Sequence, residues 1–216
     1  MSRILARLAI VLAVVLGGSL LASPAWADTV SLPLRDAVAS LPVAAEDRTG
    51  YDRDLFPLWV DADGDGCNTR YEVLIAEATT APTVGSGCSL SGGEWYSYYD
   101  GATWTATSDV DIDHVVALAE AWDSGAGGWT TSRRQSYAND LHDARPLIAV
   151  TDNVNQSKGD QDPTTWIPAL EQCRYVGDWV AVKLRWRLTV DTAEQNALAD
   201  LAGGCPNNTI TVTRAF

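Results

Sequence analysis

Apolar side chains recur along the chain with two different periods, one typical of strands and one typical of helices. Strand patterns occur at residues 95–99, 110–114 and 147–150, where apolar or aromatic residues alternate or run together. Helical spacing is expected over residues 69–79, 115–122, 131–139, 168–190 and 192–201. A short helix is also expected after residue 150, capped by Thr151 or Asp152 and ended by Gly159. Because no internal repeat or linker interrupts this order, we predict a single α+β domain.

The first 27 residues have the pattern of an export signal. Arg3 and Arg7 precede an apolar run over residues 8–21, and Ala25-Trp-Ala offers a small-x-small cleavage site. The run is shorter than the ~18–20 apolar residues that a spanning helix needs. We therefore expect a signal peptide over 1–27, a secreted extracellular protein and no membrane attachment of the mature form.

The residues after this signal divide into two expected parts. Residues 28–50 are rich in Pro and Ala and contain only a short amphipathic stretch at 32–41. We expect them to form a loosely docked N-terminal arm. The remaining patterns all lie in residues 51–216, which are expected to form the folded domain.

Charge and composition narrow the classes of function. Among 216 residues, Lys and Arg number 15 against 28 Asp and Glu, so the net charge is −13. A field of this sign argues against binding to nucleic acid or anionic membranes through overall charge. The two histidines, His114 and His142, are too few for a zinc site built from several His. Nine Trp residues could supply core packing or stacking surfaces for sugars or bases.

Four cysteines have a different meaning in an exported protein than in a cytosolic one. In an oxidising compartment Cys67, Cys88, Cys173 and Cys205 are expected to form two disulfides. Three pairings are possible, and we favour Cys67–Cys88 with Cys173–Cys205 because each closes a local loop. A zinc site using all four is the alternative, but no pair has the C-x-x-C spacing typical of such sites.

Three polar residues occur where two strands and a helix follow one another. Asp113 and His114 end the strand at 110–114, and Asn155 lies on the helix after the strand at 147–150. A neutral imidazole can take a proton from water at physiological pH. A carboxylate and an amide oxygen suit Mg²⁺ or Mn²⁺, which neutralise charge on a phosphate. Asp113 and His114 can face one phosphate only if they lie where the strand bends or ends.

The same segments resemble a known family. The runs DIDHVVALAEAWDSGA from Asp111, YAND from Tyr137, LIAV from Leu147 and NQSKGD from Asn155 resemble the secreted HNH endonucleases, as does DGCNTRYEVL from Asp65. The resemblance implies a ββα-metal core within an HNH nuclease domain over 51–216. It implies His114 as the general base and Asp113 and Asn155 as metal ligands. The expected activity is metal-dependent phosphodiester hydrolysis in DNA, with RNA as a further candidate substrate. Low sequence specificity is expected because the sequence shows no recognition module, and no protein partner is predicted.

Several neighbouring residues are candidates for supporting roles. Lys158 and Arg70 are candidate phosphate contacts, although Lys158 could instead balance a helix end and Arg70 could pair with Glu72 or Asp65. Many HNH sites carry a middle Asn that holds the base, and the corresponding segment 141–146 has none. Asn139, Asp143 or a backbone carbonyl could hold His114. Lys183, Arg185 and Arg187 form the densest basic run, which is either a solvated face or a DNA-steering surface.

The segment from Asp61 to Glu72 suggests a rival function. Asp61, Asp63, Asp65 and Glu72 satisfy the calcium-loop pattern D-x-D-x-D-G-x5-E. Against a paired calcium loop, Asn68 stands at a normally apolar position, and the carboxylates could instead form a turn that caps the next helix. The rival hypothesis is a non-catalytic extracellular module that binds Ca²⁺ here and carbohydrate through its Trp faces.

Overall fold

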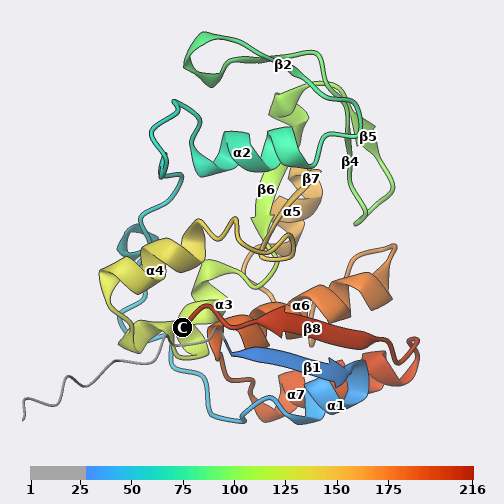
Figure 1. The fold of residues 1–216 in the computed structure, drawn as a ribbon. Helices are drawn as coiled ribbons and strands as arrows, with labels where there is room; N and C mark the ends of the chain where they lie inside the picture. Colours follow the sequence, from blue (N-terminus) through green and yellow to red (C-terminus); the bar gives the residue numbers. More distant parts are fainter. Residues whose placement is uncertain (1–27) are drawn as a thin grey trace, which may run out of the picture.

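Seven α-helices and four two-stranded antiparallel ribbons make up residues 28–216, the part of the chain that the computed structural model describes (Figure 1). The predicted export signal at 1–27 lies outside this part. Mixed α and β structure was expected and is found. Short 3-10 turns occur at Arg53–Leu55 (η1), Ser86–Cys88, Thr107–Asp109 and Ala126–Gly128.

A strand pair followed at once by a helix occupies the middle of the fold. β6 (Val110–His114) pairs antiparallel with β7 (Leu147–Thr151), with Asp113 opposite Ile148 and His114 opposite Leu147. α5 (Asp152–Lys158) begins directly after β7 and contacts both strands. It ends at Gly159, whose φ of 57° is a left-handed conformation that glycine adopts at little cost. The predicted order of strand, excursion, strand and short helix is therefore present.

A smaller layer covers the other side of this strand pair. α2 (Thr69–Ala76) is capped by Asn68, whose side chain accepts a hydrogen bond from Tyr71 N, and it packs on β6 and β7. Two of its residues, Val73 and Leu74, share a cluster with buried Trp95. The ribbons β2 (Thr83–Val84) with β3 (Leu90–Ser91) and β4 (Trp95–Tyr96) with β5 (Thr103–Trp104) complete this layer. The strand expected at 95–99 is thus shorter than predicted.

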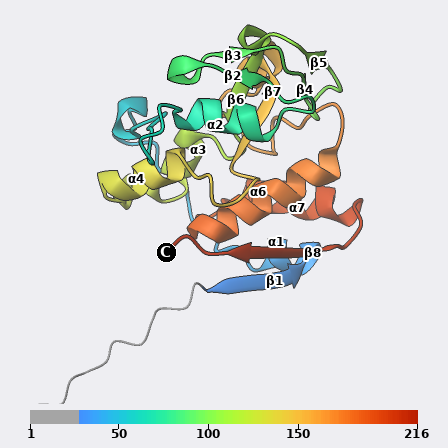
Figure 2. The same ribbon diagram turned by 45° about the horizontal axis from the view of Figure 1, so that its top comes forward.

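The larger core lies around the longest helix. α6 (Gln172–Trp186) runs between the β6–β7 region and the C-terminal ribbon, as Figure 2 shows, and is buried from Tyr175 to Trp186. α7 (Thr192–Gly203) packs on α6. α3 (Leu118–Asp123) and α4 (Thr131–Ala138) contribute further core residues, among them Trp122 and Tyr137. α6 is shorter than the helix expected over 168–190, because Glu171 and Arg187 at its two ends are left-handed.

Residues 29–41 of the N-terminal segment pack into this core, which corrects the expectation of a loosely docked arm for that part, whereas residues 42–50 are exposed. β1 (Thr29–Pro33) pairs along its whole length with β8 (Thr209–Thr213). α1 (Leu34–Ala39) packs on α7, and its side chains of Leu34, Ala37 and Val38 are buried. β1 and β8 were not predicted, although Thr-Ile-Thr-Val-Thr at residues 209–213 alternates as an amphipathic strand does. A sequence pattern within one short segment cannot reveal that β1 pairs with β8, because the two strands lie at opposite ends of the described chain.

Both predicted disulfides are present. Cys67 bonds to Cys88 and Cys173 to Cys205, with Cα–Cα distances of 5.0 and 5.5 Å. The local pairing is confirmed, and a zinc site made of the four cysteines is excluded because all four sulfurs are used. Within residues 28–216, every helix is too short or too polar to cross a membrane.

Candidate functional site

β6 and α5 present polar side chains with matching spacing. Asp111 and Asp113 lie two residues apart on one face of the strand, and Asn155 and Lys158 lie three residues apart on one face of the helix. Asn155 Nδ2 donates to Asp111 Oδ2 at 3.2 Å, and Lys158 Nζ donates to Asp113 Oδ1 at 2.9 Å. Packing of α5 against β6 therefore joins residues that lie 44 and 45 positions apart in the chain.

The three residues predicted for the chemistry meet in one cavity. Asp113, His114 and Asn155 all line a cavity of about 330 Å³. Successive strand residues point to opposite faces, so Asp113 and His114 can share a cavity only near the end of a strand. β6 does end at His114, and the chain turns toward α3 from Val115 onward. The convergence of the three side chains follows from this geometry, while their chemical roles stay predictions.

Asp113 is held by two donors. Lys158 Nζ contacts Oδ1, and the Tyr99 hydroxyl donates to Oδ2 at 2.6 Å. Lys158 also donates to the backbone carbonyl of His114 at 3.0 Å. Burial raises the pKa of the Asp113 carboxyl, while Lys158 and Tyr99 oppose that shift by stabilising the carboxylate. The result is a carboxylate in a fixed orientation at the cavity wall.

His114 is oriented by a backbone carbonyl. Its Nε2 lies 3.0 Å from the Ala138 carbonyl oxygen at the end of α4. Because a carbonyl only accepts, Nε2 carries the proton and Nδ1 is left as the basic atom. Burial lowers the pKa of His114 to about 4, which the bond to Ala138 partly opposes. The ring, packed 5.7 Å from the Trp59 ring centroid, is therefore neutral at physiological pH.

The two side chains predicted as alternatives for holding His114 have other partners. The Asn139 side-chain oxygen accepts hydrogen bonds from Val60 N and Thr69 Oγ1, and its nitrogen donates to the carbonyls of Pro57 and, within α4, of Gln135. Asn139 thus connects α4 to two distant segments. Asp143 forms an ion pair with Arg145, in which Arg145 Nε donates to Oδ1 at 2.7 Å. Of the three possibilities left open by the sequence, the structure supports the backbone carbonyl.

The cations considered as phosphate contacts mostly serve the fold. Lys158 is fully buried against Asp113, and Arg70 donates to the carbonyls of Thr107 and Val110 at 3.1 and 2.8 Å. Arg70 thus holds the start of β6, and it pairs with neither Glu72 nor Asp65. A role for either cation in binding phosphate stays a prediction.

The basic run of α6 does not form a surface. Lys183 is fully buried and contacts Glu120 and Glu194, and Arg185 is buried against Asp140, with Nε 2.6 Å from Oδ2. Only Arg187, beyond the end of the helix, is substantially exposed. Both predictions for this basic run, a solvated face and a DNA-steering surface, are therefore wrong, because this part of α6 is packed among core elements.

Two residues of the cavity wall that precede β6 in the chain were not predicted from the sequence. Tyr51 and the exposed Arg53 line the same cavity as His114. Arg53 begins η1, a turn in which the Asp52 side chain accepts a hydrogen bond from Asp54 N. The positive charge of Arg53 contributes to the lowered pKa of His114, which is a sign of their proximity. No local pattern marks these residues, because their neighbours in the cavity come from β6 and α5.

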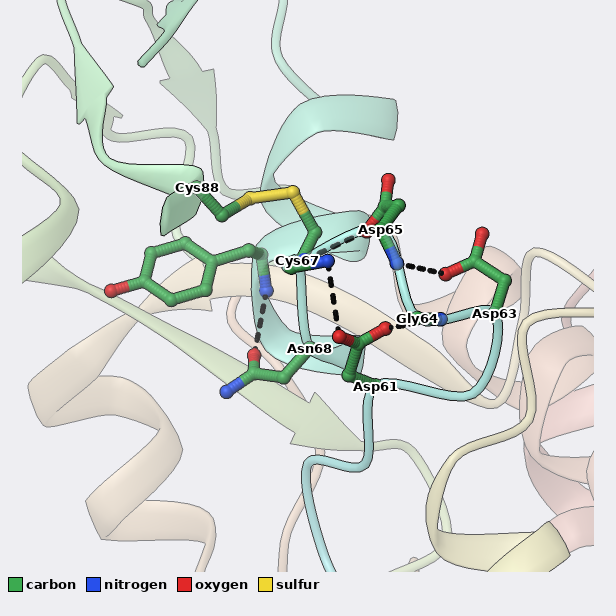
Figure 3. Close-up of a disulfide and its surroundings, with 9 residues drawn as sticks. Asp61, Asp63, Gly64, Asp65, Cys67, Asn68 and Cys88 are labelled. Carbon is green, nitrogen blue, oxygen red and sulfur yellow. Dashed lines mark hydrogen bonds between the residues drawn. A yellow bond between two sulfur atoms is a disulfide. The ribbon is translucent and has the colours of Figure 1, made fainter. Parts of the chain in front are cut away.

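The acidic loop before α2 gathers its carboxylates without joining them to the cavity. Figure 3 shows Asp61, Asp63 and Asp65 next to the Cys67–Cys88 disulfide, and their carboxylate oxygens lie within 4.8 Å of one another. Asp61 accepts hydrogen bonds from Gly64 N and Gly66 N. Glu72 lies within the same distance of Asp65 but is not grouped with Asp61. A calcium site here stays a prediction.

The chain is similar to a known protein family and to an uncharacterized secreted protein. The family described as the C-terminal domain of GmrSD restriction endonucleases matches residues 76–201, a range that contains Asp113, His114 and Asn155. An uncharacterized secreted protein of Arthroderma benhamiae is 48% identical over 204 residues, which cover 90% of this chain and 98% of the relative. No solved structure matches the chain.

Proposed function

The chain belongs to the family of C-terminal domains of GmrSD restriction endonucleases, and from this membership we propose that it is a secreted, metal-dependent endonuclease. The proposed substrate is DNA, RNA is the further candidate substrate, and the cleavage has low sequence specificity. Export agrees with the two disulfides and with the secreted relative. The observation that carries the proposal is the meeting of Asp113, His114 and Asn155 in one cavity.

The β6–β7 pair and α5 form the proposed ββα-metal core. In this core, the end of the first strand supplies a carboxylate and a base, and the helix supplies a second ligand. The support is the contact of α5 with both strands and the two hydrogen bonds from α5 to Asp111 and Asp113. These contacts place Asn155 and Asp113 on the same cavity wall.

The donor set fits a hard divalent cation. Asp113 has one hydrogen-bond partner on each carboxylate oxygen, so each oxygen keeps a lone pair for a metal. Asn155 uses its amide nitrogen on Asp111, which leaves the amide oxygen as a ligand. Oxygen donors of this kind suit Mg²⁺ or Mn²⁺ better than zinc. When bound, such an ion neutralises charge on the phosphate and on the leaving 3′-oxygen.

His114 acts as the general base in this proposal. The Ala138 carbonyl holds the proton on Nε2, so the Nδ1 lone pair takes a proton from a water molecule. The water oxygen then forms a bond to phosphorus while the bond from phosphorus to the 3′-oxygen breaks, and the leaving oxygen takes a proton from solvent. The low pKa of the ring keeps Nδ1 unprotonated over the physiological range.

The test is plasmid nicking by the purified mature protein in EDTA, Mg²⁺, Mn²⁺ or Ca²⁺, beside His114→Ala and the matched control His142→Ala. We expect cleavage that needs Mg²⁺ or Mn²⁺, falls about a hundredfold or more in His114→Ala and persists in His142→Ala. If neither wild type nor His114→Ala cleaves the plasmid in any metal, the proposal is overturned. That outcome would favour the calcium- and carbohydrate-binding module, although Trp95, Trp179 and Trp186 are buried and offer it no stacking surface.

A further inference from the structure

The cavity beside His114 carries one positive charge that no neighbouring carboxylate balances. Its two carboxylates are already paired, Asp113 with Lys158 at 2.9 Å and Asp160 with Arg48 at 2.7 Å. The remaining charged side chain of the wall is Arg53, which forms no ion pair with any carboxylate of residues 28–216. Arg53 therefore supplies the unpaired positive charge of the cavity wall, which an anion could use.

Arg53 differs in this respect from the other cations of the described chain. Each of the others places its charged group against a carboxylate or a backbone carbonyl, as Arg70 and Lys183 do. The acidic neighbours Asp52 and Asp54 do not line the cavity. In a protein with a net charge of −13, a single uncompensated guanidinium at the candidate site is a local binding feature.

The backbone beneath Arg53 is well anchored. Arg134 Nε donates to the Leu55 carbonyl at 3.0 Å, which holds the end of η1. The next residue, Phe56, is buried, with its ring centroid 6.3 Å from Trp122 and 6.2 Å from Tyr137. A fixed backbone with an exposed side chain lets the guanidinium reach into the cavity without reordering the segment.

We propose that Arg53 binds the substrate phosphate in this cavity, with its guanidinium donating to the non-bridging oxygens. The planar fork of an arginine matches two phosphate oxygens at once. This inference rests on the proposed nuclease function and names Arg53 as its phosphate-binding residue. Tyr51, on the same cavity wall, packs edge-on against Trp122 with ring centroids 5.9 Å apart.

The experiment compares wild type with Arg53→Ala, Arg53→Lys and the control Arg187→Ala, which removes an equal charge outside the cavity. Binding of a short fluorescent DNA duplex is measured in EDTA at several salt concentrations, and KM and kcat are measured in Mg²⁺. For Arg53→Ala we expect about tenfold weaker binding and a slope of log K against log salt that is smaller by about 0.9. Arg53→Lys should keep the slope, and Arg187→Ala should match wild type.

The outcomes separate this inference from the function on which it rests. If wild type cleaves and Arg53→Ala has the same KM, affinity and salt slope, Arg53 does not bind the phosphate and only this inference fails. An equal loss in Arg187→Ala would show a general effect of charge and would also overturn it. Wild type that neither binds nor cleaves the duplex would overturn the proposed function as well. Thermal unfolding of each variant checks that the substitution, made at an exposed position, leaves the fold intact.

Discussion

Lys158 Nζ lies 2.9 Å from Asp113 Oδ1, and the two side chains are 0% and 5% exposed. The ammonium thus balances the buried carboxylate that we propose as a metal ligand. Breaking a buried ion pair by removing one partner leaves the other charge uncompensated, which costs far more than the pair itself contributes. This relationship links the stability of the fold to the charge at the candidate site.

Replacing Lys158 with Met should destabilise the protein in EDTA by about 3 to 5 kcal/mol. A divalent cation bound at Asp113 would supply the missing positive charge, so Mg²⁺ or Mn²⁺ should raise the stability of Lys158→Met more than that of wild type. Urea unfolding in EDTA and in each metal measures both effects. The double variant Lys158→Met/Asp113→Asn should lose the metal response. An equal metal response in wild type and Lys158→Met would contradict the prediction.

Asn139 is expected to matter for stability and little for the chemical step. Its amide joins α4 to the segments around Pro57 and Thr69, so Asn139→Ala should lower the free energy of unfolding by about 2 to 4 kcal/mol. Because the Ala138 carbonyl holds His114, kcat measured well below the melting temperature should change little. A large fall in kcat at unchanged stability would show instead that Asn139 orients the ring.

Glu77 should make the protein less stable as pH rises. Its carboxyl accepts a hydrogen bond from Ala149 N at 2.6 Å, and burial raises its pKa from 4.5 to about 7. A raised pKa means that the folded state prefers the protonated form, so the contribution is complete below pH 4.5 and is lost as pH rises through 7. Glu77→Gln keeps an acceptor without the charge. It should match wild type near pH 4 and exceed it at pH 8 by up to about 3 kcal/mol.

Urea unfolding of wild type and Glu77→Gln between pH 4 and pH 8 measures this difference. The exposed Glu171→Gln removes the same charge and should follow the wild-type profile. A constant difference between Glu77→Gln and wild type across the range would mean that the Glu77 carboxyl is not the titrating group.

The acidic loop predicts a response to calcium that is independent of the cavity. If Asp61, Asp63 and Asp65 hold Ca²⁺, a concentration one hundred times the Kd should stabilise the protein by about 2.7 kcal/mol. Asp63→Asn should remove the response, whereas Asp113→Asn should keep it. Thermal unfolding in Ca²⁺, Mg²⁺ and EDTA measures the effect, and identical curves for wild type in Ca²⁺ and EDTA would exclude the site.

Local signals were enough to locate the strands and the helix that carry the candidate site. The strand at Val110–His114 and the helix that ends before Gly159 follow from apolar spacing and from the conformational freedom of glycine, which act over a few residues. The two disulfides also follow from chain proximity, because each joins cysteines at the ends of one loop. Asp113, His114 and Asn155 could be named as candidates because they lie on these elements and because the same segments resemble the secreted HNH endonucleases.

Tertiary structure alone decided the partner of each polar group. His114 bonds to a carbonyl 24 positions away, Lys158 reaches Asp113 across 45, and Arg53 shares a cavity with residues of β6 and α5. A sequence pattern reports how side chains are spaced along one element, whereas these contacts depend on how separate elements pack. Burial of α6 likewise turned an apparent basic surface, Lys183 and Arg185, into internal ion pairs. The sequence therefore determined which chemical groups are present and on which elements, and packing decided which of them are free to act.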